Sequence, residues 1–367
     1  MTRISRRGLL GGSITLGAGA ALAGKTIMQH GTRRYEMPLE SEPHERCLMQ
    51  WPVSLAVYDR AALVRVQQAV ARIATTIARH EPVAMLVGRD QAAAARLMLG
   101  GAVELWDIST DDLWCRDSGP TFVRGADGKL AVALIQFNGW GNKQPHARDK
   151  LIARKVAQRL GLPVIASGLV GEQGGVEHDG AGTVLAHASS WANPNRNRLP
   201  LAEIERRLLA ALGGRKMIWA PGIKGKDITD YHIDALARFV GPGKVLIQLG
   251  EAIDHDDPWS VAGHETLRIL QAACDANGNR LQIIRLPEPL DTRVTSADFV
   301  ASYVNYYVAN GAVIAAQFGD SRADGRAREL LQDLYPGRAV EMIEIDAIGE
   351  NGGGIHCATQ QQPKAEA

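Results

Sequence analysis

The sequence has little net charge and no excess of basic residues. Its 367 residues carry 41 lysines and arginines against 40 aspartates and glutamates, a formal charge of +1. Nucleic-acid binding depends on clustered basic side chains that neutralise phosphates, so this balance predicts no nucleic-acid partner. It attracts a small cationic substrate only weakly.

Long apolar runs are also missing. Outside the N-terminus no segment approaches the ~20 apolar residues that span a bilayer, and we expect no stable membrane span. Residues 1–24 contain the pair Arg6-Arg7, then a Gly/Ala-rich stretch ending in Ala21-Leu22-Ala23. This is the pattern of a twin-arginine-type signal segment. It predicts an exported protein, periplasmic or secreted, although a frayed N-terminus of a cytosolic enzyme would read similarly.

Without the three arginines of that segment, residues 25–367 have a formal charge of −2. No polar linker divides them, so we expect a single catalytic domain. Cysteine is scarce, with only Cys47, Cys115, Cys274 and Cys357. Two disulfides are conceivable in an oxidising compartment, but a nucleophilic Cys357 would leave three thiols and at least one free. We predict no essential disulfide.

Short apolar runs alternate with helical patterns, which predicts an α/β fold. No Gly-rich nucleotide-binding loop follows any of these runs. The predicted strands are 83–87, 103–108, 130–137, 183–188, 217–220, 245–249, 281–286, 312–318 and 340–345, and the predicted helices are 59–79, 148–160, 201–212 and 266–276.

Polar, Gly-punctuated segments between these elements hold the residues able to do chemistry. Cys357 follows three glycines and could act as a nucleophile if a base or cation favours its thiolate. His232 and Asp234 would share one face of a strand, and Asp117 and Glu172 add two carboxylates. Each of these residues also has a purely structural interpretation. Cys357 could be an ordinary buried cysteine, and His232 and Asp234 could form a structural hydrogen bond. Asp117 could pair with the adjacent arginine, and Glu172 could be a turn residue.

The spacing of these anchors is regular. Asp117 and Glu172 are 55 residues apart, Glu172 and His232 60, and His232 and Cys357 125, about twice that step. Five units of roughly 65 residues would fill the chain, as in a small propeller whose loops converge on one point.

Seven motifs occur in the same order as in a known family, at residues 37–44, 49–52, 114–120, 137–141, 193–197, 229–234 and 353–363. The sequence resembles the agmatine deiminase and Porphyromonas-type peptidylarginine deiminase family of the pentein superfamily. The resemblance implies a five-bladed α/β propeller of ββαβ-like units around a central site, with no metal or organic cofactor.

The same resemblance implies roles for individual residues. Cys357 would be the nucleophile, His232 the general acid/base, and Glu172 the residue that orients the histidine. Asp117 and Asp234 would bind the guanidinium. Independently of the resemblance, Trp51, Trp114 and Trp140 are candidates for the wall of the substrate site, Trp114 first among them, although aromatic residues belong more often to the core. Three positions depart from the family pattern: Gln173 and Tyr231 stand where glycine is common, and Gly354 where agmatine-specific members often have asparagine.

The predicted reaction is hydrolysis of a guanidine, with agmatine as the leading substrate and N-carbamoylputrescine and ammonia as products, a step toward putrescine. The arginine side chain of peptides is the alternative substrate. An amidinotransferase, a cysteine protease, a metallohydrolase using His232, Asp234 and His356, and a non-catalytic guanidine-binding protein are the other readings. Whether the protein forms a homo-oligomer stays open.

Overall fold

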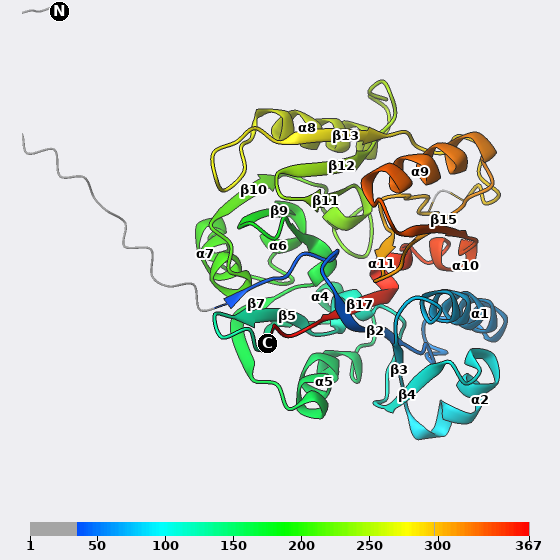
Figure 1. Ribbon diagram of the computed structural model, residues 1–367. Helices are drawn as coiled ribbons and strands as arrows, with labels where there is room; N and C mark the ends of the chain where they lie inside the picture. Colours follow the sequence, from blue (N-terminus) through cyan, green and yellow to red (C-terminus); the bar gives the residue numbers. More distant parts are fainter. Residues whose placement is uncertain (1–34, 297, 367) are drawn as a thin grey trace, which may run out of the picture. The chain divides into compact units, whose positions relative to one another are not determined.

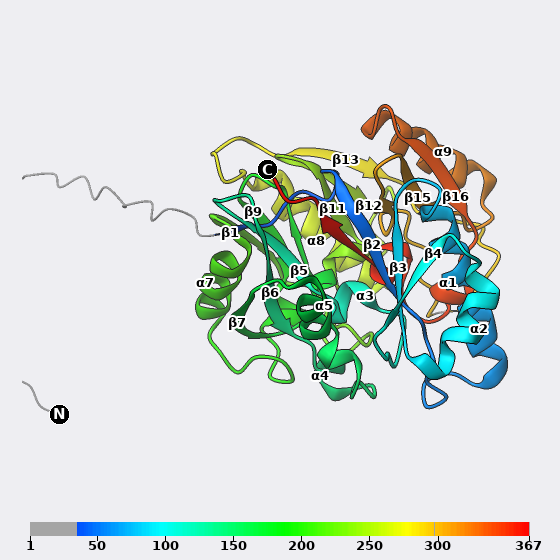
Figure 2. The ribbon, with the colours of Figure 1, turned by 60° about the horizontal axis from the view of Figure 1, so that its bottom comes forward.

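The computed structural model describes residues 35–296 and 298–366. These contain five β-sheets, and each sheet repeats one pattern: an antiparallel strand pair followed by a parallel pair joined through a helix. Figures 1 and 2 show the sheets grouped around a centre, with the longer helices on the outside. The sequence prediction of a pentein propeller is confirmed by this arrangement.

The described helices and strands fall into five units. The first has β2 (His44–Gln50), α1 (Arg60–Ile77), β3 (Val83–Val87), α2 (Arg89–Leu99), β4 (Val103–Asp107) and, from the chain's end, β17 (Thr359–Pro363); the second has β1 (Tyr35–Glu36), β5 (Thr121–Gly125), β6 (Leu130–Gln136), α5 (Ile152–Leu160) and β7 (Val164–Val170). The third has β8 (Val176–His178), β9 (Thr183–His187), α7 (Leu201–Leu212) and β10 (Lys216–Ala220); the fourth has β11 (Ala237–Gly241), β12 (Lys244–Gln248), α8 (Pro258–Ala272) and β13 (Gln282–Leu286); the fifth has β14 (Tyr307–Val308), β15 (Ala312–Ala316), α9 (Ser321–Leu334) and β16 (Ala339–Ile343).

Shorter helical turns lie between these elements. They are α3 (Cys115–Ser118), α4 (Gly139–Asn142), η1 (Asp149–Leu151), η2 (Gln173–Gly175), α6 (Ala188–Trp191), η3 (Ile233–Ala235), α10 (Asp346–Gly349) and α11 (Ile355–Ala358).

All nine predicted strands are present, but one helix prediction needs correction. Helix α8 begins at Pro258 rather than at Thr266 and ends at Ala272. Asp257 caps it by accepting from the backbone N–H of Trp259 and Ser260, and a proline in the first turn is favourable for a helix start. The sequence prediction overlooked this Asp-Pro signal, and it missed helices α2 and α9.

The apolar core lies between the sheets and their outer helices. Helix α1, for example, buries Val66, Val70, Ile73 and Ile77 in the largest core cluster, together with residues of β3 and β15. Among the described residues, no helix combines the length and apolarity needed to cross a bilayer. The predicted signal segment, residues 1–24, lies outside the described residues, so export stays a prediction.

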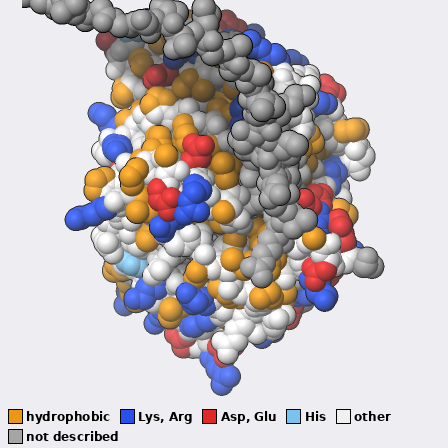
Figure 3. Space-filling model, turned by 90° about the vertical axis from the view of Figure 1, so that its left-hand side faces the viewer, with side chains coloured by type: hydrophobic (Ala, Val, Ile, Leu, Met, Phe, Trp, Pro, Cys, Tyr) orange, Lys and Arg blue, Asp and Glu red, His pale blue; other side chains and the backbone are white. Residues whose placement is uncertain are grey.

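Surface charge is mixed on the face shown in Figure 3. Basic and acidic side chains are interspersed there with apolar ones, and no broad basic area is visible outside the part that undescribed residues cover. This mixture agrees with the near-zero net charge of the sequence.

Candidate active site

Five short segments meet at the centre of the propeller, one from each unit. Each segment directly precedes the first strand of an antiparallel pair: α3 precedes β5, η2 precedes β8, η3 precedes β11, the turn at 303–305 precedes β14, and α11 precedes β17. Contacts between α3 and α11, α3 and η2, and η2 and η3 join these segments. The fold therefore brings together residues that are far apart in the sequence.

His232 lies between two carboxylates. Its Nε2 is 3.1 Å from Glu172 Oε2, and its Nδ1 is 3.7 Å from Asp117 Oδ1. Burial opposes a charge on the imidazole, but the carboxylates of Asp117 and Glu172 overcome this effect and raise the pKa of His232 to about 9. At neutral pH the ring is therefore a cation that can donate a proton.

The side chains of three site residues, Asp117, His232 and Asp234, come close together next to the backbone of Gly174. A Cβ on this glycine would lie 2.7 Å from Asp117 Oδ1, 2.9 Å from His232 Nδ1 and 3.1 Å from Asp234 Oδ2. Its backbone N–H donates to Asp117 Oδ1 at 3.2 Å. Any side chain here would push these three groups apart, so the position requires glycine.

The carboxylate of Asp117 is buried, and hydrogen bonds hold it in place. Trp140 Nε1 donates to its Oδ2 at 2.9 Å. Burial raises the pKa of Asp117 to about 6, against the opposing charge of His232. The group is nevertheless ionised at neutral pH and can bind a cation.

Asp234 contacts both Cys357 and the buried side chain of His356. Its Oδ2 accepts from His356 Nδ1 at 2.8 Å and lies 3.6 Å from Cys357 Sγ. Burial would raise the pKa of Asp234, but the hydrogen bond and charge of His356 hold it below its usual range. Asp234 Oδ1 is buried and has no hydrogen-bond partner among the described residues. A buried carboxylate oxygen of this kind is a strong acceptor for a cationic N–H group.

Cys357 is 9% exposed. Burial raises the pKa of its thiol, and the nearby charges of Asp234 and Asp117 raise it further. Without a bound cation the sulfur is therefore a neutral thiol. All four cysteines are free thiols in the structure.

A buried arginine holds the carboxylate that pairs with His232. Arg196 Nε donates to both oxygens of Glu172 at 3.0 Å, and its Nη1 donates to Asp230 Oδ2 at 2.6 Å. Asp230 also accepts from Lys143 Nζ at 2.7 Å. Arg196 therefore holds the Glu172 carboxylate in place. From the sequence, Arg196 was recognised only as part of a family motif.

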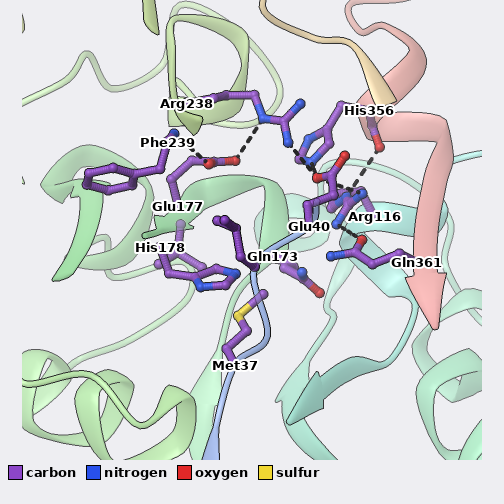
Figure 4. A pocket seen from close by; sticks show the side chains of 12 residues that line it. Met37, Glu40, Arg116, Gln173, Glu177, His178, Arg238, Phe239, His356 and Gln361 are labelled. Atoms are coloured by element: carbon purple, nitrogen blue, oxygen red, sulfur yellow. Dashed lines mark hydrogen bonds and ion pairs between the residues drawn. The ribbon is translucent and has the colours of Figure 1, made fainter. Parts of the chain in front are cut away.

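A second polar network lies behind the site residues, in the pocket of Figure 4. His356 Nε2 contacts Glu40 Oε2 at 2.9 Å, and Glu40 in turn pairs with Arg238. The pocket is lined by the chain neighbours of three site residues, namely Arg116, Gln173 and His356. Side chains on one side of these segments thus form the site, and those on the other side anchor it.

The sequence prediction for His232 and Asp234 was wrong in one respect. These residues do not lie on a strand, because His232 is the extended residue before the turn η3 and Asp234 lies within that turn. The chain enters the turn through Asp230 and Tyr231, whose φ angles are 59° and 72°. Both predicted side chains still reach the site, but they make different contacts there.

The three residues that depart from the family pattern are all buried. Tyr231 keeps a left-handed backbone that glycine adopts without strain, and its ring packs on His187 at 4.5 Å and on Trp259 at 4.8 Å between centroids. Gln173 is buried at the start of η2, with its side chain in the pocket behind the site. A Cβ on Gly354 would lie 2.5 Å from Asn305 Oδ1, so a larger residue here would displace the Asn305 side chain.

Trp51 and Trp114, two of the three tryptophans predicted as walls of the site, are both buried. Trp114 lies directly against Gly353, where a Cβ would collide with its ring, and this glycine precedes the nucleophile by four residues. Trp51 is 1% exposed and packs in the same core cluster. A contact of either ring with substrate stays a prediction.

The sequence suggested Trp140 only as a possible wall of the site, and it assigned no role to Arg196 or Asn305 and no anchoring role to His356. Asn305, in the turn before β14, donates from Nδ2 to Cys357 Sγ at 3.1 Å. Trp140 and Arg196 lie in matched motifs, and that position was the available signal. His356 had been considered only as a metal ligand. Among the described residues, no group of three or more His, Cys, Asp or Glu side chains is arranged to hold a metal ion.

The centre of the molecule therefore holds a cysteine, a cationic histidine and two buried aspartates in a pentein propeller. Residues 36–363 match the model of the Porphyromonas-type peptidyl-arginine deiminase family, and the chain belongs to this family. A protein of Streptomyces coelicolor, named provisionally as an agmatine deiminase, is 40% identical over 90% of this chain and 99% of its own length. The agmatine deiminase of Medicago truncatula is 36% identical over 90% of this chain and 96% of its own.

The fold agrees with a solved structure of the same kind. The agmatine deiminase of Enterococcus faecalis superposes with a TM-score of 0.83 and 28% identity, over 90% of this chain and 96% of that one.

Proposed function

We propose that the protein is a guanidine deiminase that converts agmatine and water to N-carbamoylputrescine and ammonia. The observation that carries this proposal is the buried carboxylate of Asp234. Its Oδ2 lies beside Cys357 and across Gly174 from Asp117, and its Oδ1 has no hydrogen-bond partner among the described residues. A guanidinium presents a planar set of N–H donors that two carboxylates can hold. In this position its carbon would lie within reach of the Cys357 sulfur.

Substrate binding itself activates the nucleophile. The charges of Asp117 and Asp234 hold the thiol protonated in the free enzyme, and a bound guanidinium neutralises them. The pKa of the thiol then falls, its proton passes to solvent, and the thiolate adds to the guanidinium carbon. A cysteine of this kind reacts only when its cationic substrate is in place.

His232 moves the protons of the two half-reactions. As an imidazolium it protonates the departing nitrogen, which leaves as ammonia and yields a covalent amidino-thioether on Cys357. The neutral imidazole then takes a proton from water as the oxygen adds to the same carbon. Collapse of this adduct expels the thiolate and, after loss of the hydroxyl proton, gives the ureido product. Glu172 and Arg196 keep the ring in place.

The burial of the site residues favours a substrate whose reacting end is narrow. Asp117, His232, Asp234 and Cys357 are all at most 9% exposed, so the reacting group has to enter a confined space. The names of the relatives also favour agmatine over peptidylarginine.

A ureido-product assay comparing agmatine, free arginine and an arginine-containing peptide tests the proposal. We expect product mainly from agmatine, with one ammonia released per turnover. An added acceptor amine should not change the product, because water is the second substrate. Product from the peptide alone would replace agmatine by peptidylarginine, and a guanidinylated amine would identify an amidinotransferase.

The pH dependence of kcat/KM should have two limbs. Asp117 has to be ionised to bind the cation, so activity should rise with pH through about 6. His232 has to be protonated to release ammonia, so activity should fall as pH rises through about 9. In Glu172→Gln, loss of one neighbouring carboxylate lowers the pKa of His232, and the upper limb should move to lower pH. An upper limb that stays in place in this variant would contradict the assignment of His232.

A further inference from the structure

The imidazole of His356 joins two buried carboxylates, one in the site and one behind it. Its Nδ1 is 2.8 Å from Asp234 Oδ2, and its Nε2 is 2.9 Å from Glu40 Oε2. Figure 4 shows the His356 ring and the Glu40 carboxylate directly next to each other. His356 is 3% exposed, so both ring nitrogens depend on these carboxylates for their hydrogen bonds.

The two contacts together define the charge of the ring. A neutral imidazole has one N–H group and can donate to only one of the two carboxylates. Glu40 also pairs with Arg238 and accepts from the backbone N–H of Val308 at 2.9 Å. Burial would raise the pKa of Glu40, but the charges of Arg238 and His356 hold it well below its usual range. Because Glu40 and Asp234 are both ionised, the ring donates from both nitrogens and is an imidazolium.

Buried charges of opposite sign alternate behind the site. The charged side chains around His356 are Asp234 on η3, Glu40 before β2, Arg116 on α3, Glu177 on β8 and Arg238 on β11. The imidazolium and the two arginines carry three positive charges, and the three acids carry three negative charges. Desolvation lowers the pKa of the other ring in this pocket, His178, to about 4, so that ring is neutral. Loss of the imidazolium would leave an uncompensated negative charge, which favours proton uptake by a carboxylate.

We propose that His356 is a positioning residue that acts through Asp234: its imidazolium keeps this carboxylate ionised and holds Oδ2, which leaves Oδ1 for the guanidinium. The inference rests on the proposed function, in which Asp234 binds the substrate cation. Oδ2 accepts from the ring, whereas Oδ1 has no partner among the described residues. His356 thus contributes to substrate binding through the charge and orientation of its neighbour.

His356→Gln and His356→Lys test the proposal through the pH profile of kcat/KM for agmatine. Glutamine removes the positive charge, whereas lysine retains one. The pKa of a buried carboxylate without a counter-charge rises by up to about 3–5 units, enough for Asp234 to pass the lower limb near pH 6 that Asp117 sets. Since Asp234 has to be ionised, this limb should move up by about one pH unit or more in His356→Gln and by much less in His356→Lys.

The loss in His356→Gln should therefore depend on pH. At pH 6 we expect kcat/KM to be about 10-fold or more below that of the wild type, and the deficit should shrink as the pH rises. His44→Gln is the matched control, because it removes another buried imidazole, between Glu81 and the backbone oxygen of Glu40, without touching the pair with Asp234. An equal deficit at every pH in His356→Gln, or an equal shift in His44→Gln, would overturn the proposal.

NMR of the free wild-type enzyme, with nitrogen-labelled histidine rings, tests the charge without a substitution. At pH 8 we expect His356 to remain an imidazolium together with His232, whose pKa is about 9. Its signal should be absent from the spectrum of His356→Lys and present in that of His44→Gln. A wild-type spectrum in which His232 alone stays an imidazolium would overturn the proposal even if neither His356 variant folds.

The two measurements separate this proposal from the proposed function. The NMR spectrum needs no substrate, so it reports on His356 even if the deiminase assignment fails. A wild type that converts no guanidine would remove the proposed function, whatever the charge of His356. Normal turnover with a lower limb that stays in place in folded His356→Gln would remove only the role of His356.

Discussion

Cys357→Ala is expected to lower turnover of agmatine by at least about 10⁴-fold, because no other group in the site can form the covalent intermediate. Substrate binding should persist. The free enzyme carries a neutral thiol, and the carboxylates of Asp117 and Asp234 that would hold the guanidinium remain. Calorimetry should therefore give a Kd within a few-fold of the wild-type KM, while a single-turnover assay finds no ureido product.

Cys274→Ala is the matched control, since Cys274 is also a free thiol and lies at a half-buried position away from the site. It should retain full turnover. Mass spectrometry of acid-quenched wild-type enzyme should find the amidino adduct on the peptide that contains Cys357 and on no other cysteine peptide. Substantial turnover by the alanine variant would remove the covalent mechanism and leave only the binding site.

Nine strands of the propeller were predictable because they follow the apolar patterns of ordinary strands, whereas the outer helices α2 and α9 were missed. Strand β15 (Ala312–Ala316) is buried throughout and entirely apolar. Two of the missed strands, β17 and β11, lack such an apolar pattern. Strand β17 is buried throughout yet reads Thr-Gln-Gln-Gln-Pro, and β11 buries Arg238. Arg238 pairs with Glu40 and Glu177, and Gln361 accepts from Arg116, so buried positions of these strands are polar and no hydrophobic periodicity marks them.

The active site, too, could be predicted only in part from the sequence. Cys357, His232 and the two aspartates could be named from residue types and motif order, but their contacts depend on turns that have no period. The 125-residue step from His232 to Cys357 contains one complete further unit, and its central residue is Asn305. The apolar residues around Asn305 indicate that it is buried, but they do not indicate that it contacts Cys357. Only its place before β14 and its contacts with Cys357 reveal it.

Asp234→Asn should change two rates in opposite directions. The variant loses the charge that the guanidinium would need, and removal of one partner of a buried charge pair costs about 3–5 kcal/mol. We therefore expect kcat/KM for agmatine to fall about 10²- to 10⁴-fold. Iodoacetamide should nevertheless alkylate Cys357 faster than in the wild type, because the charge of Asp234 raises the pKa of the thiol and the amide does not.

Asp179→Asn separates this effect from general damage to a buried carboxylate. Asp179 is 1% exposed and accepts from the N–H groups of Ala181 and Thr183, away from the sulfur. Its variant should leave the alkylation rate of Cys357 unchanged. Faster alkylation in Asp234→Asn, with Asp179→Asn unchanged, would show that the carboxylate of Asp234 suppresses the thiolate in the free enzyme. Slower alkylation in Asp234→Asn would mean that this aspartate stabilises the sulfur anion, and activation by substrate would then be wrong.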